Sequence, residues 1–98
     1  VRATSTTPLQ SLFAMNDPFV HERAARFAAR IMSAESDEQQ RITLAFLTLY
    51  ARPPEPEETA MFTAFLAQLR DTKKLPPDQA WASLSRVLLG ANEFLYLD

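Results

Sequence analysis

The amino-acid sequence predicts an all-α fold, a compact bundle of about five helices, and three observations support this. The 98 residues include a single Gly, whereas a fold rich in tight β-turns normally needs several. Apolar residues make up 47% of the chain and recur at helical spacing in several segments. Prolines and capping residues divide the chain into stretches of ordinary helix length. We expect residues 1–6 to be the remnant of a linker and residues 7–98 to form one helical domain, the C-terminal domain of a longer chain.

Two helix starts lie near the N-terminus. Thr7 can cap a short helix that ends near Met15. Asp17 can cap a second helix that begins at Pro18 and ends by Ala34. The apolar residues of this second helix recur on one face, which predicts that the face is buried. They are Val20, Ala24, Phe27, Ala28 and Ile31.

The third predicted helix follows a capping box at residues 36–39. Its apolar residues are spread over nearly every face, which is typical of the buried centre of a bundle. We therefore expect this helix to be central. The residues concerned are Ile42, Leu44, Ala45, Phe46, Leu47, Leu49 and Tyr50.

Two further helices are predicted after the proline-rich segment 52–56, which breaks the chain. The fourth helix opens at Pro56, and its predicted inward residues are Met61, Phe62, Phe65, Leu66 and Leu69. The fifth begins near Pro77 or Asp78, and its predicted inward residues are Trp81, Leu84, Val87 and Leu88. We expect it to end at Gly90, because glycine suits the end of a helix, and we expect the apolar tail 91–98 to pack back on the bundle.

Three blocks of the sequence, in this order and spacing, carry a family resemblance. The first block comprises Pro8–Leu12 and Met15–Val20, the second comprises Arg52–Pro54 and Pro56–Glu58, and the third comprises Trp81, Leu88, Leu89 and Asn92–Tyr96. Together they resemble the C-terminal domain of unknown function in large planctomycete proteins, over nearly the whole chain. In that family the domain ends a chain that often also holds a cytochrome-c-like haem domain.

The resemblance implies an exported parent protein, periplasmic or extracellular, with any haem bound upstream of this domain. It implies no activity. Two positions depart from the family pattern: Ala51 stands where Gly is common, and Glu55 stands where a Thr or Ser cap is common.

Composition restricts the chemistry that this chain can carry. The net charge of −2 argues against a nucleic-acid partner, since such proteins normally show a basic excess. The absence of Cys excludes disulfides, thiolate metal ligands and covalent haem attachment within the chain. No apolar run is long enough to insert into a membrane. We expect no catalytic residue, metal or cofactor in this domain.

For several groups that could act as catalytic, metal-binding or ligand-binding residues, we favour a structural interpretation. His21 lies one turn after Asp17 but lacks a third ligand or a nucleophile. The acid pairs at 37–38 and 57–58 suit the positive ends of helices better than acid–base catalysis. Arg23, Arg26 and Arg30 are interpreted as a solvated stripe rather than a phosphate site, and Trp81 with the phenylalanines as core rather than as a ligand pocket.

One set of polar residues lies within the family-like blocks. We predict that it forms either a structural cluster or a patch that binds a partner. Specifically, Arg52 is predicted to pair with Glu93 or Asp17, because all three lie at helix ends, where charges and backbone groups need partners. The set is Asn16, Asp17, Arg52, Asn92 and Glu93.

Three functions remain open from the sequence. The leading prediction is a non-catalytic accessory domain of a large exported multidomain protein, which packs on neighbouring domains of the same chain. The first alternative is an interaction module that binds another protein or a cell-surface polymer. The second is a contributor to an enzyme site formed mainly by upstream domains, which requires Asp17, His21 or Glu93 to cluster around one cleft.

Overall fold

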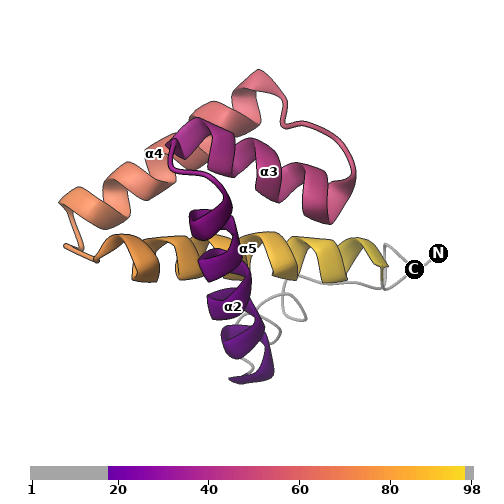
Figure 1. Ribbon diagram of the computed structural model, residues 1–98, viewed down its shortest axis with the longest axis horizontal. Helices are drawn as coiled ribbons and strands as arrows, with labels where there is room; N and C mark the ends of the chain where they lie inside the picture. The colour runs from indigo at the N-terminus through magenta and orange to yellow at the C-terminus, as the bar shows by residue number, and fades with distance from the viewer. Residues whose placement is uncertain (1–17, 97–98) are drawn as a thin grey trace.

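The computed structural model describes the backbone of residues 18–96 and the side chains of residues 18–91. This part of the chain contains four helices and no strand (Figure 1), which confirms the all-α prediction. The helices are α2 (Pro18–Ala34), α3 (Glu38–Tyr50), α4 (Pro56–Asp71) and α5 (Pro77–Tyr96). The prediction of about five helices is therefore one more than the described residues contain. The helix predicted over residues 7–15 lies outside the described residues.

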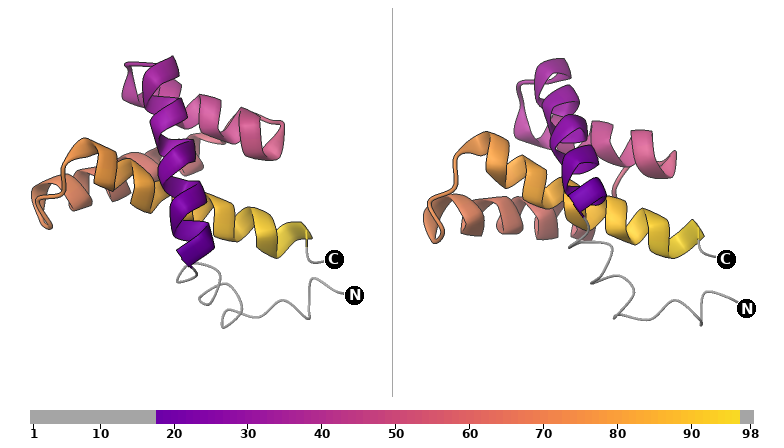
Figure 2. Two further views of the ribbon diagram at one scale, coloured as in Figure 1. Left: turned by 60° about the horizontal axis from the view of Figure 1, so that its bottom comes forward. Right: turned by 90° about the horizontal axis from the view of Figure 1, so that it is seen from below.

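The arrangement is built around α5, which runs along the length of the molecule (Figures 1 and 2). Helix α2 crosses α5 and contacts it more extensively than any other pair of described helices contact each other. Ala24, Ala28 and Ser85, which are small side chains of these two helices, are almost completely buried. Small residues at a crossing allow two helices to approach closely, which accounts for the extensive contact.

The stripe predicted for α2 is confirmed, because its five residues are the ones that this helix buries. Phe27, Ala28 and Ile31 belong to the main hydrophobic core. The other helices complete this core with Ile42, Ala45, Phe46, Leu66, Leu69, Ala80, Trp81, Leu84 and Leu88. Trp81 is only 3% exposed, so its assignment to the core is also confirmed.

The prediction that the third helix is the central one is wrong. Helix α3 contacts each of the other described helices, but α5 makes far more contacts with them. One face of α3 remains in solvent, where Leu47 is 46% exposed. The prediction that Met61 on α4 faces inward is also wrong, because this side chain is 57% exposed. A short bundle has too little interior to bury every apolar face, so single apolar side chains remain outside.

The fifth helix does not end at Gly90 but continues to Tyr96. Gly90 is buried within the helix, and no glycine has a positive φ. A glycine ends a helix when it takes the left-handed conformation, which this one does not. Residues 91–96 therefore extend α5 instead of forming a separate tail, and the side chains after Ala91 lie outside the described part of the structure.

Three helix ends show how the local sequence sets the boundaries. Asp37, one residue later than the predicted cap, accepts a hydrogen bond from the backbone nitrogen of Gln40 at 3.0 Å and so caps α3. Ala51 ends α3 in the left-handed conformation, with φ 59° and ψ 30°. Lys74 takes a similar positive φ of 58° after α4, and the backbone N–H of Leu75 bonds to the carbonyl of Leu69 across that turn.

Candidate functional site

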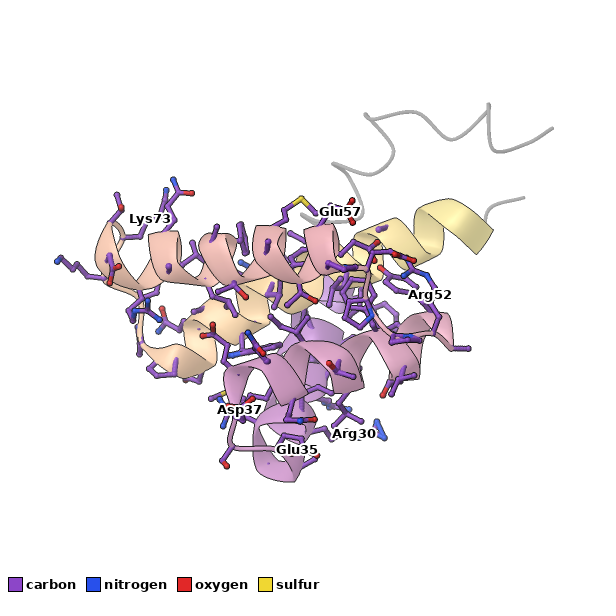
Figure 3. The ribbon with its side chains drawn as sticks, turned by 90° about the horizontal axis from the view of Figure 1, so that it is seen from above. Arg30, Glu35, Asp37, Arg52, Glu57 and Lys73 are labelled. Atoms are coloured by element: carbon purple, nitrogen blue, oxygen red, sulfur yellow. The ribbon has the colours of Figure 1, made fainter. Side chains whose placement is uncertain are left out.

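Of the five residues predicted to form a polar cluster, only Arg52 has a described side chain. It lies in the connection between α3 and α4 (Figure 3). Asn16 and Asp17 lie outside the described residues, and the side chains of Asn92 and Glu93 are not described either. The predicted pairing of Arg52 with Glu93 or Asp17 therefore stays a prediction.

Arg52 does have a carboxylate partner among the described residues, which is Glu58 in the first turns of α4. Its Nη1 donates to Oε1 of Glu58 at 2.8 Å, and its Nη2 donates to Oε2 at 2.9 Å. This two-point geometry matches the planar guanidinium to the planar carboxylate. Nη1 also donates to the carbonyl of Pro53 at 3.0 Å, so the arginine holds the proline-rich connection as well as the helix.

Glu58 also binds the backbone at the start of its own helix. Its Oε1 accepts from the backbone nitrogen of Glu55 at 2.7 Å, which is the reciprocal half of a capping box. The Arg52 hydrogen bonds first, and this backbone hydrogen bond second, lower the pKa of the Glu58 carboxyl to about 2. Glu55, the residue that precedes α4, thus stands at a helix start that Glu58 supports.

The guanidinium of Arg52 also lies over two aromatic rings of α3. Its central carbon is 5.5 Å from the ring centre of Phe46 and 6.0 Å from that of Tyr50. These are cation–π distances. The two rings pack edge to face, with their centres 5.2 Å apart.

Tyr50 extends the same set of contacts to helix α5. Its hydroxyl donates to the backbone carbonyl of Leu88 on α5 at 2.8 Å. Burial raises the pKa of the Tyr50 hydroxyl to about 12, because the charged phenolate would lose its hydration there. Arg52, Glu58 and Tyr50, which we call the α3–α4 clamp, thus connect the end of α3 to the start of α4 and to the middle of α5.

Sequence reasoning singled out Arg52 but missed Glu58 and Tyr50 as its neighbours. Glu58 was interpreted only as an acid suited to the helix start, and Tyr50 only as an apolar residue. The usable signal was the spacing of Glu55 and Glu58, which places a carboxylate at the third position of the helix, where it can bond to the cap. The course of the proline-rich connection, which places Arg52 next to Glu58, has no comparable local signal.

A second arginine, Arg41 on α3, was not predicted to have any role. It donates from Nε to the carbonyl of Glu35 at 2.5 Å and from Nη2 to the carbonyl of Met32 at 3.2 Å. These carbonyls lie at the C-terminal end of α2, where backbone oxygens have no partner within the helix and a positive charge is favoured. Arg41 therefore caps α2 from the neighbouring helix.

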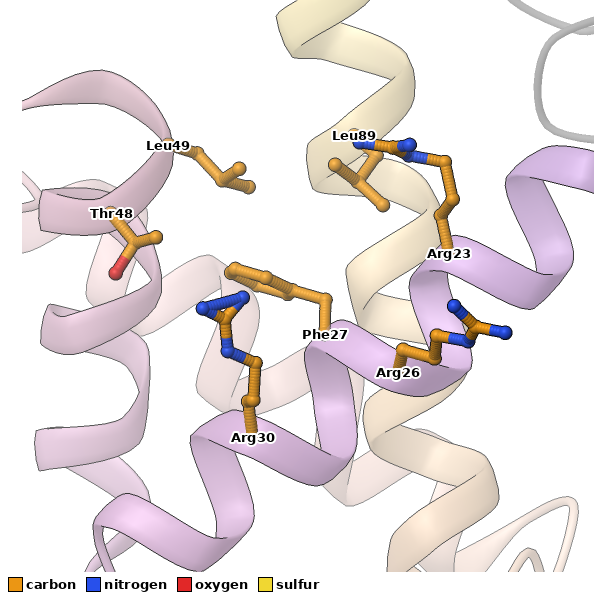
Figure 4. A pocket seen from close by; sticks show the side chains of 7 residues that line it. All are labelled: Arg23, Arg26, Phe27, Arg30, Thr48, Leu49 and Leu89. Atoms are coloured by element: carbon orange, nitrogen blue, oxygen red, sulfur yellow. The ribbon is translucent and has the colours of Figure 1, made fainter.

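The arginines of α2 border a groove of about 360 Å³, seen from close by in Figure 4. Phe27 points into it between Leu49 of α3 and Leu89 of α5, and these three side chains form an apolar floor. Arg23, Arg26, Arg30 and Thr48 form the rim. We call this feature the arginine groove.

The three arginines of the groove differ in their partners. Arg26 pairs with Glu22 at 2.8 Å on the exposed face of α2. Arg23 lies 5.2 Å from the ring centre of Phe19, in a cation–π contact. Neither Arg23 nor Arg30 has a carboxylate partner among the described residues. The stripe predicted to be solvated is exposed as expected, but it also borders a concave apolar surface.

The other candidate groups do not come together among the described residues. His21 is exposed on α2, while Asp17 and the side chain of Glu93, with which it was considered, lie outside the described part of the structure. Of the two acid pairs, Asp37 caps α3 and Glu58 belongs to the α3–α4 clamp. Residues 18–91 include no group of three or more His, Cys, Asp or Glu side chains that could hold a metal ion. No helix between residues 18 and 96 has both the length and the apolar character that a membrane span requires.

Comparison with known proteins places the chain in a family. A family model described as PSD1, protein of unknown function (DUF1553), matches residues 1–66, which is more than half of the chain. No curated protein and no solved structure is found to match. The chain therefore belongs to the PSD1 family of proteins of unknown function (DUF1553).

Proposed function

We propose that this chain is a non-catalytic accessory domain that packs against neighbouring domains of a larger exported protein. The observation that supports this most is the α3–α4 clamp. The described groups with the largest pKa shifts, Glu58 and Tyr50, are both engaged in holding helices together. A perturbed pKa is a marker of function only when the group faces a cleft that a substrate can enter, and structural ion pairs perturb pKa values as well.

The finer parts of the proposal rest on the family resemblance of the three sequence blocks. They are the planctomycete source, the export of the parent protein and the presence of a haem domain upstream. Membership of the DUF1553 family supports the assignment to a domain of unknown function. The accessory role adds to this the idea that the domain's surface, rather than a catalytic centre, is what the parent protein uses.

The experiment that tests the proposal is a chemical-shift titration. The ¹⁵N-labelled chain is mixed with the remainder of its parent protein as a separate, unlabelled molecule. We expect shifts confined to one face of the bundle, since a docked domain buries a contiguous surface. An unchanged spectrum at saturating concentrations of the parent would contradict docking.

The second candidate is an interaction module that binds a different protein, and the arginine groove favours it. Concave apolar surfaces with a few charged groups at the rim are typical of binding sites. Here the floor is apolar and the rim holds two arginines without a carboxylate partner among the described residues. The two candidates share the surface and differ in where the partner comes from.

A further inference from the structure

We propose that the arginine groove binds an acidic peptide segment of a protein partner, with one apolar side chain of that segment seated on Phe27, Leu49 and Leu89. The inference rests on the proposed function, because it names the face and the chemistry by which this domain docks. The segment belongs to a neighbouring domain of the parent protein, and a segment of a separate protein is the other outcome of the test.

The charge of the rim defines the first requirement for the partner. Arg23 and Arg30 lie one above the other on α2, seven residues apart, with Arg26 between them. The whole chain has a net charge of −2, so this run of cations is a local excess against an acidic background. Carboxylates of a partner would pair with Arg23 and Arg30 without breaking an ion pair in the described structure.

The floor defines the second requirement. Phe27 belongs to the hydrophobic core and is only 9% exposed, but its ring forms part of the groove surface together with Leu49 and Leu89. A groove of about 360 Å³ lies near the lower limit for ligand sites and has room for one or two side chains. An apolar anchor on this floor would remove apolar surface of both partners from water.

The geometry favours a peptide over a nucleic acid. Binding along a nucleic-acid strand combines a long basic track with exposed aromatic faces on which bases stack. The floor of this groove instead offers a mostly buried Phe27 and two leucines, and the net charge of the chain, −2, does not favour a long polyanion. An apolar floor with a short cationic rim matches a segment in which acidic residues flank one apolar residue.

The test uses a synthetic probe, the dye-labelled peptide Gly-Glu-Glu-Leu-Glu-Glu-Gly, and measures fluorescence anisotropy with the intact 98-residue chain. We expect binding that weakens as salt is added, because exposed charge pairs are screened. Replacing the four Glu by Gln, or the Leu by Ser, should weaken binding several-fold. Equal binding of all three peptides would overturn the inference, as would tighter binding of a labelled oligothymidylate of the same charge.

Protein variants locate the site. Arg23→Gln and Arg30→Gln should each weaken peptide binding about threefold to fivefold, the range expected for an exposed charge pair. Arg70→Gln is the matched control, since it removes the same charge from α4, outside the groove, and should leave the affinity unchanged. Equal losses in all three variants would show a general charge effect and would refute the groove as the site.

The same variants separate this inference from the proposed function. If the parent protein shifts the signals of Phe27, Thr48 and Leu89, and Arg30→Gln weakens that interaction, both stand. If the parent docks on another face, the accessory role stands and the groove proposal fails. If the peptide binds the groove while the parent protein gives no shifts, the groove takes acidic peptides but the parent protein is not their source, and docking onto the parent protein fails.

Discussion

The guanidinium of Arg52 and the carboxylate of Glu58 meet end to end, with two hydrogen bonds of 2.8 and 2.9 Å. The arginine precedes α4 and the glutamate lies in its first turns, so the pair closes the proline-rich connection onto the helix that follows. Because the arginine also lies over the rings of Phe46 and Tyr50, this one side chain contacts both the end of α3 and the start of α4.

This pair predicts a specific dependence of stability on pH. The pKa of Glu58 is lowered to about 2 in the folded protein, from an ordinary value of 4.5. Its contribution to the free energy of unfolding is therefore complete above pH 4.5 and is lost as the pH falls toward 2. Urea unfolding between pH 6 and pH 2 should show that Glu58→Gln removes part of this slope. Glu57→Gln, an exposed neighbour in the same turn, is the control and should leave the slope as it is.

Tyr50 predicts the opposite behaviour at high pH. Its pKa is raised to about 12 from 10.0, so the stability that this buried hydroxyl provides is present below pH 10 and is lost as the pH rises toward 12. Tyr50→Phe should lower the free energy of unfolding by about 1 kcal/mol at neutral pH, the usual value of one hydrogen bond. An ultraviolet absorbance titration of the two proteins should differ by one phenol that ionises near pH 12. A difference curve centred near pH 10 would show that the hydroxyl is not buried.

The two left-handed residues predict stabilising substitutions. Ala51 and Lys74 have φ angles of 59° and 58°, a conformation that glycine adopts with little strain. Ala51→Gly and Lys74→Gly should each raise the free energy of unfolding by about 0.5–1 kcal/mol. Ala29→Gly, on an exposed turn within α2, should instead lower it by about 1 kcal/mol. Thermal unfolding of the three variants checks the signs, and three changes of the same sign would contradict the prediction.

Arg41 predicts a cost for losing a cap supplied by another helix. Arg41→Met keeps the apolar stem and removes the donors to the carbonyls of Met32 and Glu35. The free energy of unfolding should fall by about 1–2 kcal/mol, since hydrogen bonds from charged groups are stronger than neutral ones. Hydrogen exchange should speed up first in the last turn of α2. Loss of protection spread evenly over all helices would argue against a capping role.

The fold was predictable where a local pattern and the environment agree. In α2 a single apolar stripe is the face that is buried, and the prolines mark where α2, α4 and α5 begin. In α3 the apolar residues surround the helix, so the sequence offered no way to tell that Leu47 would stay in solvent. The prediction that the fifth helix ends at Gly90 was wrong for a related reason, because a glycine suits both a helix end and a buried position within a helix.

The site was less predictable than the fold because its contacts depend on the paths of the connections. Arg52 reaches Glu58 across the proline-rich connection, and Arg41 reaches Met32 across the α2–α3 turn. The ring contacts of Arg52 and the hydrogen bond from Tyr50 to Leu88 join residues on different elements. Spacing along a single helix carries no information about such pairs.

The central claim is that the α3–α4 clamp serves the fold and that docking uses another surface. The most direct test measures two properties of Glu58→Gln, its free energy of unfolding and its affinity for the remainder of the parent protein. We predict a lower free energy of unfolding and, at a temperature where the variant is fully folded, an unchanged affinity. An unchanged free energy of unfolding together with a several-fold loss of affinity would contradict the claim and would make Arg52 and Glu58 part of the partner-binding surface.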